Sequence, residues 1–264
     1  MITLTVDREL CKQCSSCISE CPFDLINFDK EGYPQLRKAA KKMCIRCGHC
    51  MAVCSADALD ISISPLAESP LVERDRLPAA ETVDHLLMSR RSIRTYRKKC
   101  ADHELLETIL DTSRYAPSAH NCQPVHWLMV EDPGEVRRLA GIVVEFMREL
   151  KLFPGLLRAW DHGVDKVLRG APHLAVAHAR EHVSEHPLED CTLAAAYMEL
   201  AAHSHGLGSC WAGFLVQAAR SYEPLIEALD LPENHQVHAA LMLGYPKFSY
   251  RHIPKRDPVK VQWR

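Results

Sequence analysis

Eight cysteines within the first 54 residues constrain this chain most strongly, because they form two copies of one run. The first copy comprises Cys11, Cys14, Cys17 and Cys21, and the second, displaced by 33 residues, comprises Cys44, Cys47, Cys50 and Cys54. This spacing is typical of [4Fe–4S] ligation, and in two-cluster proteins the fourth cysteine of each run binds the other cluster. The sequence therefore predicts one cluster on Cys11, Cys14, Cys17 and Cys54, and a second on Cys44, Cys47, Cys50 and Cys21.

Zinc and disulfides explain the same cysteines less well. Zinc takes four ligands and has no need of three cysteines in sequence plus a fourth, twice over. The N-terminal residues contain no basic stretch followed by an apolar one, so we expect no secretory signal and no oxidising compartment. Pro22 follows the first run, whereas Ser55 stands after the second. With these motifs, residues 1–63 resemble the bacterial two-[4Fe–4S] ferredoxin family.

The overall charge narrows the class of partner. The chain has 264 residues, a formal net charge of −2 and 25% charged residues. This balance is ordinary for a globular protein and provides no global field for nucleic acid or an anionic membrane. We find no apolar run long enough to span a bilayer. We therefore expect a cytoplasmic protein that binds neither nucleic acid nor membrane.

Three prolines divide the chain into two parts. Pro65, Pro70 and Pro78 lie close together in a segment of mixed charge, where they break both helix and sheet. We predict a two-cluster ferredoxin domain over residues 1–63, a linker over 64–80 and a second domain over 81–264. In the second domain helices alternate with apolar strands, so the expected fold class is α+β.

Apolar periodicity predicts the elements of the second domain. We expect helices over residues 82–90, 102–115, 135–150, 188–205 and 222–229, and strands over residues 126–130, 174–179 and 237–243. Asp102 is a candidate N-cap for its helix. The glycine-rich residues 206–213 are expected to form a loop whose backbone amides approach a flat ligand.

Four short stretches carry candidate ligand-binding groups. Residues 90–94 place three arginines and a serine where they either complement a helix C-terminus or hold a phosphate. Residues 116–124 form a polar loop between a helix and a strand. The glycine-rich residues 206–213 form the third stretch. The fourth is Gly244-Tyr245-Pro246, which leads into a basic tail.

In this order the four stretches resemble the nitroreductase family over residues 82–258. The resemblance implies FMN, bound non-covalently at the interface of a homodimer. It implies a phosphate and pyrimidine site formed by Arg90, Arg91, Ser92 and Arg94, completed by Arg256 or Arg251. It further implies that the flavin ring is lined by Pro117, Ser118 and Asn121, and that its N5 faces backbone amides near Trp211, Ala212 and Gly213. No catalytic side chain is assigned.

The two parts together predict an FMN-dependent oxidoreductase whose clusters relay electrons to the flavin. The expected substrate is a small nitroaromatic, quinone or enone-like molecule. Because the chain lacks a Rossmann fingerprint, we expect an external ferredoxin or another iron–sulfur donor rather than NAD(P)H. Two alternatives stay open. One is an NAD(P)H-dependent nitro or quinone reductase with the clusters as electron exit, and the other is an electron-transfer or redox-sensing module without turnover.

A basic stretch leads up to the second cysteine run and ends within it. It contains Arg37, Lys38, Lys41, Lys42 and Arg46. A solvated face is the favoured interpretation of such a stretch, and a docking patch for an acidic electron donor is the alternative.

Overall fold

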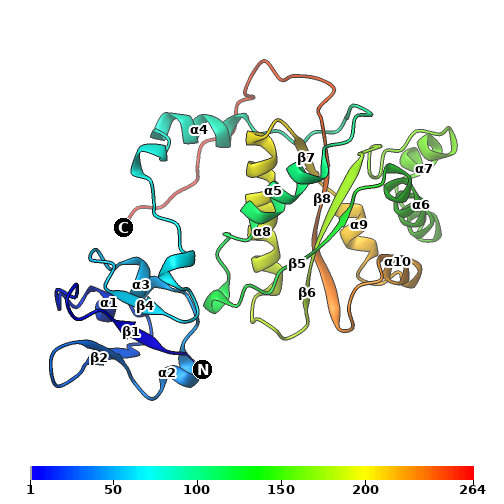
Figure 1. The fold of residues 1–264 in the computed structure, drawn as a ribbon. Coiled ribbons are helices and arrows are strands. Elements are labelled where there is room, and N and C mark those ends of the chain that lie inside the picture. The colour runs from blue at the N-terminus through cyan, green and yellow to red at the C-terminus, as the bar shows by residue number, and fades with distance from the viewer. Residues whose placement is uncertain (1) are drawn as a thin grey trace. The chain divides into compact units, whose positions relative to one another are not determined.

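The structure, a computed structural model, describes residues 2–264. The chain forms two compact units, one ending at Leu77 and the other spanning Pro78–Arg264. Figure 1 labels most of their helices and strands.

The first unit is built from two short antiparallel strand pairs. Strand β1 (Leu4–Val6) pairs with β4 (Leu59–Ile61), so the beginning and end of the cysteine-rich region lie side by side. Strand β2 (Ile26–Phe28) pairs with β3 (Pro34–Leu36). The short helices are α1 (Ser16–Ser19), α2 (Ala40–Met43) and α3 (His49–Ala52). A small core of buried residues fills the space between them and comprises Cys17, Ile26, Cys50, Met51, Leu59 and Ile61.

The segment after β4 contains two 3-10 turns, Leu66–Glu68 and Arg74–Arg76. It is rich in exposed side chains, and Leu71 and Val72 are both almost 80% exposed. The backbone leaves this segment at Leu77 and enters the second unit at Pro78.

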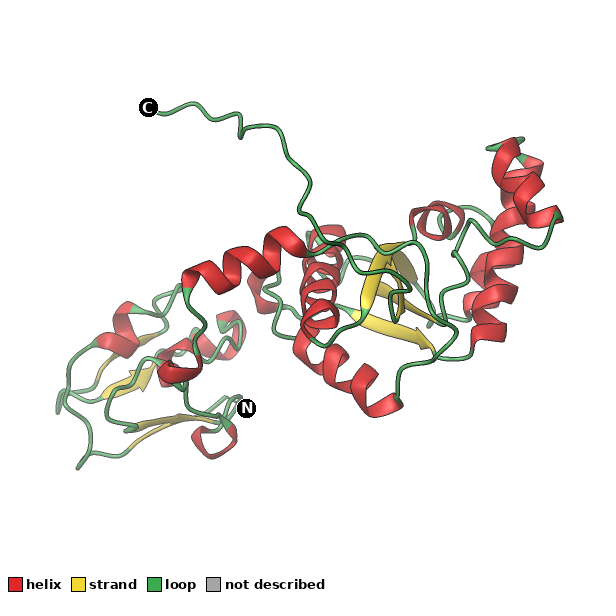
Figure 2. Cartoon of the chain, turned by 90° about the horizontal axis from the view of Figure 1, so that it is seen from above, coloured by secondary structure: helices red, strands yellow, loops and turns green. Residues whose placement is uncertain are grey.

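The second unit is organised around one four-stranded antiparallel sheet in the order β5-β6-β8-β7. The strands are β5 (His126–Val130), β6 (His173–Arg180), β7 (Gly208–Trp211) and β8 (His235–Gly244). The α-helices are α4 (Ala80–Ser89), α5 (His103–Ser113), α6 (Pro133–Glu149), α7 (Pro154–Asp161), α8 (Pro187–Ser204), α9 (Gly213–Ala218) and α10 (Glu223–Leu229). Figure 2 shows helices on both faces of the sheet.

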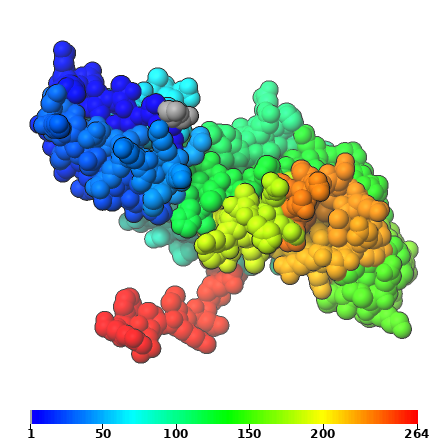
Figure 3. All heavy atoms as spheres, turned by 90° about the horizontal axis from the view of Figure 1, so that it is seen from below, coloured from blue at the N-terminus to red at the C-terminus, as the bar shows by residue number. Residues whose placement is uncertain are grey.

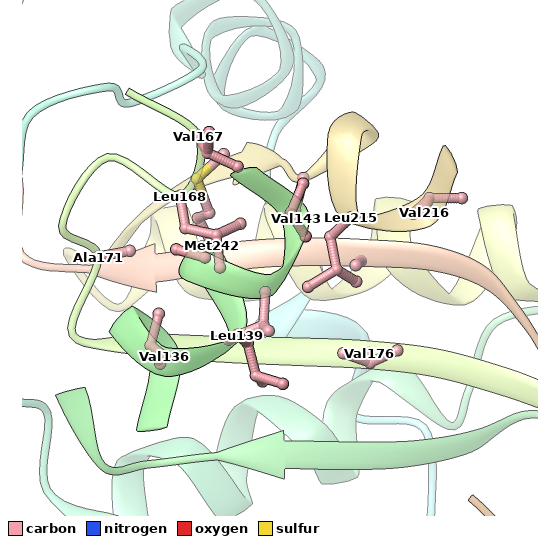
Figure 4. Close-up of a cluster of buried hydrophobic side chains, with 14 of the residues drawn as sticks. Val136, Leu139, Val143, Val167, Leu168, Ala171, Val176, Leu215, Val216 and Met242 are labelled. Atoms are coloured by element: carbon pink, nitrogen blue, oxygen red, sulfur yellow. The ribbon is translucent and has the colours of Figure 1, made fainter. Parts of the chain in front are cut away.

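Successive side chains of a strand point to opposite faces of the sheet, and this alternation divides the core into two layers. Leu174 and Val176 of β6 belong to the cluster on the side of α6 and α9. Figure 4 shows Val176 in this cluster with Val136, Val143 and Leu215. Ala175 and Ala177, which follow Leu174 and Val176 along the strand, face α5 and α8. Because those side chains are small, the Ala-rich helix α8 lies close to the sheet. This is the period-two pattern of a strand that is buried on both faces.

The fold class and the main elements predicted from the sequence are confirmed, with boundaries shifted by one or two residues. One expectation was wrong. Residues 208–211 form strand β7 at the edge of the sheet rather than a loop, because Gly208 and Trp211 pair with Gly244 and Leu241 of β8. The periodicity also missed β2, β3, α7 and α9, which are all short. Asp102 stands at the N-cap of α5, but its side chain makes no cap hydrogen bond.

The last fourteen residues form an exposed segment without helix or strand. Figure 3 shows this C-terminal segment leaving the body of the second unit. Val259, Val261 and Trp263 in it are exposed. Within the described residues 2–264, no helix has both the length and the apolar character needed to span a membrane.

Candidate functional site

The eight cysteines of the two runs gather as two sets of four. One cavity of the first unit is lined by Cys11, Cys14, Cys17 and Cys54. A second cavity is lined by Cys21, Cys44, Cys47 and Cys50. Each cavity thus takes three cysteines from one run and the last cysteine from the other run.

The backbone around the two runs repeats as well. Gln13 and Ser15 have positive φ angles of 50° and 64°, and the residues 33 positions later, Arg46 and Gly48, have 60° and 71°. Left-handed residues at these positions turn the chain sharply, so three successive cysteines point to one side. Ser15 and Gly48 then stand at the N-caps of α1 and α3, which carry Cys17 and Cys50.

The thiols of the two cavities suit a positively charged cluster core. Burial, together with the charges of Cys47, Cys21 and Cys44, raises the pKa of Cys50 to about 11. Burial likewise raises the pKa of Cys17, and Cys54, Cys14 and Cys11 add to the effect. Cys50 and Cys17 therefore resist ionising unless a metal supplies compensating charge, whereas hydrogen bonds with Ser16 lower the pKa of Cys14. Iron–sulfur chemistry meets that requirement.

In the second unit, three of the four predicted stretches meet at the β7 edge of the sheet. After α4 ends, the chain runs beside β7, where the Ile93 N–H donates to Ser209 O at 2.8 Å and Ser92 bridges to Ser209. Tyr96 then bridges to Pro246. Gly208 permits the approach, because a Cβ on it would lie 2.8 Å from Ile93 Cβ. Residues 90–94, 206–213 and 244–246 are thereby brought together.

A carboxylate that sequence reasoning missed organises this region. Glu199 of α8 accepts a hydrogen bond from Ser209 Oγ at 2.9 Å and pairs with Arg90 Nη1 at 3.4 Å. The Glu199 side chain is only 19% exposed. In the sequence, Glu199 is an acidic residue within an Ala-rich helix. Hydrophobic periodicity alone assigns such an acidic side chain to solvent. The carboxylate instead joins α8, β7 and the end of α4.

Arg91 has the unsatisfied donor expected of an anion site. Its Nε is buried and has no hydrogen-bond partner within the described chain. The residue lines a cavity of about 540 Å³ together with Arg97, Gly208, Lys247 and Tyr250. Buried polar groups without partners are rare in folded proteins, so an unfilled donor beside further basic residues fits a phosphate-bearing ligand.

The other predicted phosphate ligands lie outside this cavity. Arg94 is exposed. Arg251 and Arg256 are exposed in the C-terminal segment, and neither lines the cavity. Arg251 follows Tyr250, whose ring lies 5.9 Å from the guanidinium carbon of Arg91. The structure therefore brings the start of the tail to Arg91.

The loop at residues 116–124 lines a separate cavity of about 190 Å³. Pro117 and Ser118 line this cavity with Asp190 of α8, whose carboxylate accepts from the Ala119 N–H at 2.8 Å. The two cavities share no lining residue. His120 and Asn121 adopt positive φ angles in this loop. One chain thus presents the loop and the arginine cavity as distinct surfaces.

The three backbone positions expected to face the flavin follow β7. Trp211 ends the strand and is 38% exposed, Ala212 is buried and Gly213 begins α9. The nearby Cys210 is buried, which raises the pKa of its thiol, and burial also raises the pKa of Tyr96. Both groups therefore stay protonated at neutral pH.

Comparison with known proteins assigns both units. Residues 87–245 match the Nitroreductase family, and residues 10–59 match the 4Fe-4S dicluster domain. A protein of Archaeoglobus fulgidus provisionally named NADH dehydrogenase/NAD(P)H nitroreductase is 31% identical, with 61% of this chain and 84% of the relative covered. The iodotyrosine deiodinase of Thermotoga neapolitana is 27% identical, covering 66% and 94%.

A solved structure agrees with these relatives. The nitroreductase of Bacteroides fragilis, crystallised with bound FMN, is 28% identical with a TM-score of 0.56, and the match covers 69% of this chain and 96% of that one. Its fold is the one described above for the second unit. The chain therefore belongs to the nitroreductase family and carries a 4Fe–4S dicluster domain ahead of the family's domain.

Proposed function

We propose that this chain is an FMN-dependent oxidoreductase in which two [4Fe–4S] clusters relay electrons to the flavin. The gathering of the eight cysteines as two sets of four, in the same chain as a nitroreductase domain, is the observation that carries the proposal. When bound, the clusters supply single-electron steps and FMN supplies the conversion to electron-pair chemistry on an organic acceptor. The linker proposed for residues 64–80 lets each unit keep its own core.

The residues present fit both cofactors. We propose Cys11, Cys14, Cys17 and Cys54 as ligands of one cluster and Cys21, Cys44, Cys47 and Cys50 as ligands of the other. For FMN, Arg90 and Arg91 supply cationic donors for its phosphate and Ser92 supplies a hydroxyl. Bound FMN in the Bacteroides fragilis structure supports FMN as the ligand of this unit. Arg94, and Arg251 or Arg256, complete the proposed set.

The site as a whole requires two copies of the chain. Pro117, Ser118 and Asn121 belong to a loop whose cavity is separate from the arginine cavity of the same chain. We propose that this loop lines the flavin of a second copy, opposite Trp211, Ala212 and Gly213, in a homodimer. A reducing compartment such as the cytoplasm suits cluster-bearing cysteines of this kind.

A small electron-deficient organic molecule is the proposed substrate. Nitroaromatic, quinone and enone-like compounds all accept electron pairs from a reduced flavin. The names of the relatives extend this range to reductive removal of iodine and point to NAD(P)H as a competing electron source. We favour reduced ferredoxin as the donor, because the chain places two one-electron carriers in its first unit.

An anaerobic titration of the reconstituted full chain distinguishes these donors. Iron, sulfide and FMN are counted first, and NADH, NADPH and reduced ferredoxin are then added separately while cluster and flavin absorbance are followed. We expect only reduced ferredoxin to bleach both centres. Rapid bleaching of the flavin by NADH or NADPH before the clusters respond would reverse the proposed direction of electron flow.

A further inference from the structure

The two segments of the first unit that carry the cysteine runs differ in charge. Residues 37–46, which lead into the second run, contain five basic residues and no acidic one. Residues 7–31, around the first run, contain six acidic and three basic residues. Glu31 lies against the first run, because its carbonyl accepts from Gln13 Nε2 at 3.1 Å. The two segments therefore differ in charge, and the acidic Glu20 and Asp24 of the first segment lie close in sequence to Cys21 of the second cavity.

Two of the basic residues, Lys41 and Lys42, belong to the short helix α2. Ala40 of α2 is 1% exposed and fixes the helix to the unit, whereas Lys41 and Lys42 beside it are exposed. The Cys44 N–H donates to Ala40 O at 3.1 Å, so the helix ends at a cysteine of the second cavity. The surface formed by Lys38, Lys41, Lys42, Met43 and Arg46 is termed the α2 surface.

The lysines of the α2 surface have no acidic neighbour. Arg37 pairs with Asp24 at 3.1 Å, and Arg8 pairs with Asp29 and Glu31 on the acidic side. Within the described residues, no carboxylate lies within 4.0 Å of the amino groups of Lys38, Lys41 or Lys42. Their charge is thus available to a partner, whereas the acidic side neutralises part of its own.

An apolar side chain lies among these charges. Met43 is 50% exposed and directly precedes Cys44, and Ile45 on the other side of Cys44 lines the cluster cavity. Methionine and arginine are enriched in protein interfaces, which combine an apolar centre with a polar rim. A docked protein that covers Met43 lies one residue from a proposed cluster ligand.

We propose that the α2 surface is the docking site for an acidic one-electron carrier protein, which delivers electrons to the cluster of Cys21, Cys44, Cys47 and Cys50. This inference rests on the proposed function and names its partner and point of entry. In each encounter one electron leaves the reduced carrier and enters the cluster, so the carrier is oxidised and the cluster reduced. No proton or atom is transferred. Charge complementarity of this kind raises the rate of productive encounter.

The test compares two charge-reversed variants of the full chain by stopped flow. Lys41→Glu/Lys42→Glu changes the α2 surface, and Lys12→Glu/Lys30→Glu makes the same change in net charge on the acidic side. A reduced acidic ferredoxin serves as the donor, and cluster bleaching is followed separately from flavin bleaching. At low salt we expect the first variant to lower the second-order rate constant about tenfold and the control to change it less than about twofold. At about 0.5 M salt the difference should disappear.

Two results would overturn the proposal. Equal slowing by both variants would mean that only net charge matters, and an unchanged rate in the first variant would mean that the carrier docks elsewhere. Cluster content, counted as iron and by EPR, shows that each variant is intact. If clusters are reduced normally but the flavin stays oxidised, the proposed function fails while the docking site stands.

Discussion

Replacing Gly208 by alanine tests how the two walls of the arginine cavity are held together. A Cβ on Gly208 would overlap Ile93 Cγ1 and lie 2.8 Å from Ile93 Cβ, both well inside an ordinary carbon–carbon contact. Ile93 is 7% exposed, and its N–H is fixed to Ser209 O at 2.8 Å. The segment at residues 90–94 must therefore move away from β7 by roughly 1 Å.

Such overpacking costs about 2 kcal/mol. For a unit of this size the change lowers the Tm by about 4–8 °C. Because Arg91 and Ser92 move with Ile93, Gly208→Ala should also purify with less FMN. The assays are thermal unfolding and the ratio of flavin to protein absorbance.

Two further variants distinguish the steric overlap between residue 208 and Ile93 from the effect that any Gly→Ala substitution has on stability. Gly155 lies in α7, and a Cβ added to it would meet no atom of the described chain within 4 Å. Gly155→Ala should therefore leave the FMN content unchanged and raise stability slightly. Ile93→Ala removes Ile93 Cγ1 and leaves Ile93 Cβ in place, so the Gly208→Ala/Ile93→Ala double variant should lose less stability than the two single variants do in sum. A Gly208→Ala protein with the Tm and FMN content of the parent would refute the described approach of residues 90–94 to β7.

Three further predictions concern other parts of the chain. Cys21→Ser should lower the iron content from about eight to about four per chain with loss of one EPR signal, whereas Cys100→Ser, outside the runs, should change neither. Burial, with His235 and His126, lowers the pKa of His178 to about 4, below the value of about 6.5 in an unfolded chain. As pH falls from about 6.5 to about 4, the unfolded chain therefore binds a proton that the folded chain does not, and stability drops by up to about 3 kcal/mol. Urea unfolding at about pH 7.5 and about pH 5 should show a smaller loss for His178→Gln, and an equal loss would contradict the assignment. Ser209→Ala removes the hydrogen bond to Glu199 and should cost about 2 kcal/mol, compared with less than about 1 kcal/mol for Ser204→Ala, which removes a bond within α8.

Sequence reasoning is most specific where chemistry fixes the spacing of residues. The cysteine runs predict which thiols meet, because a cluster constrains three ligands in one turn and the repeat supplies the fourth. The left-handed angles at Gln13 and Arg46 show the same repeat in the backbone. These ligand sets themselves stay a prediction until clusters are bound and counted.

Sequence reasoning failed where long-range pairing overrides local preference. Gly208 has no strand propensity, yet it enters β7 because β8 offers an open edge and Ile93 needs the space that a side chain would fill. In the sequence, nothing distinguishes Glu199 from an ordinary exposed acidic residue of an Ala-rich helix. Its role depends on its contacts with Ser209 and Arg90, which lie outside that helix. The periodicity of a single segment cannot predict a contact between residues of different elements.

The central claim is that electrons reach the flavin through the clusters. It is tested most directly by mixing reduced ferredoxin with the full chain and with a Cys17→Ser/Cys50→Ser variant that lacks both clusters but carries the same amount of FMN. We predict that the flavin of the parent is bleached after the clusters, and that the flavin of the variant stays oxidised on the same timescale. Bleaching of the variant's flavin at the rate of the parent would contradict the account.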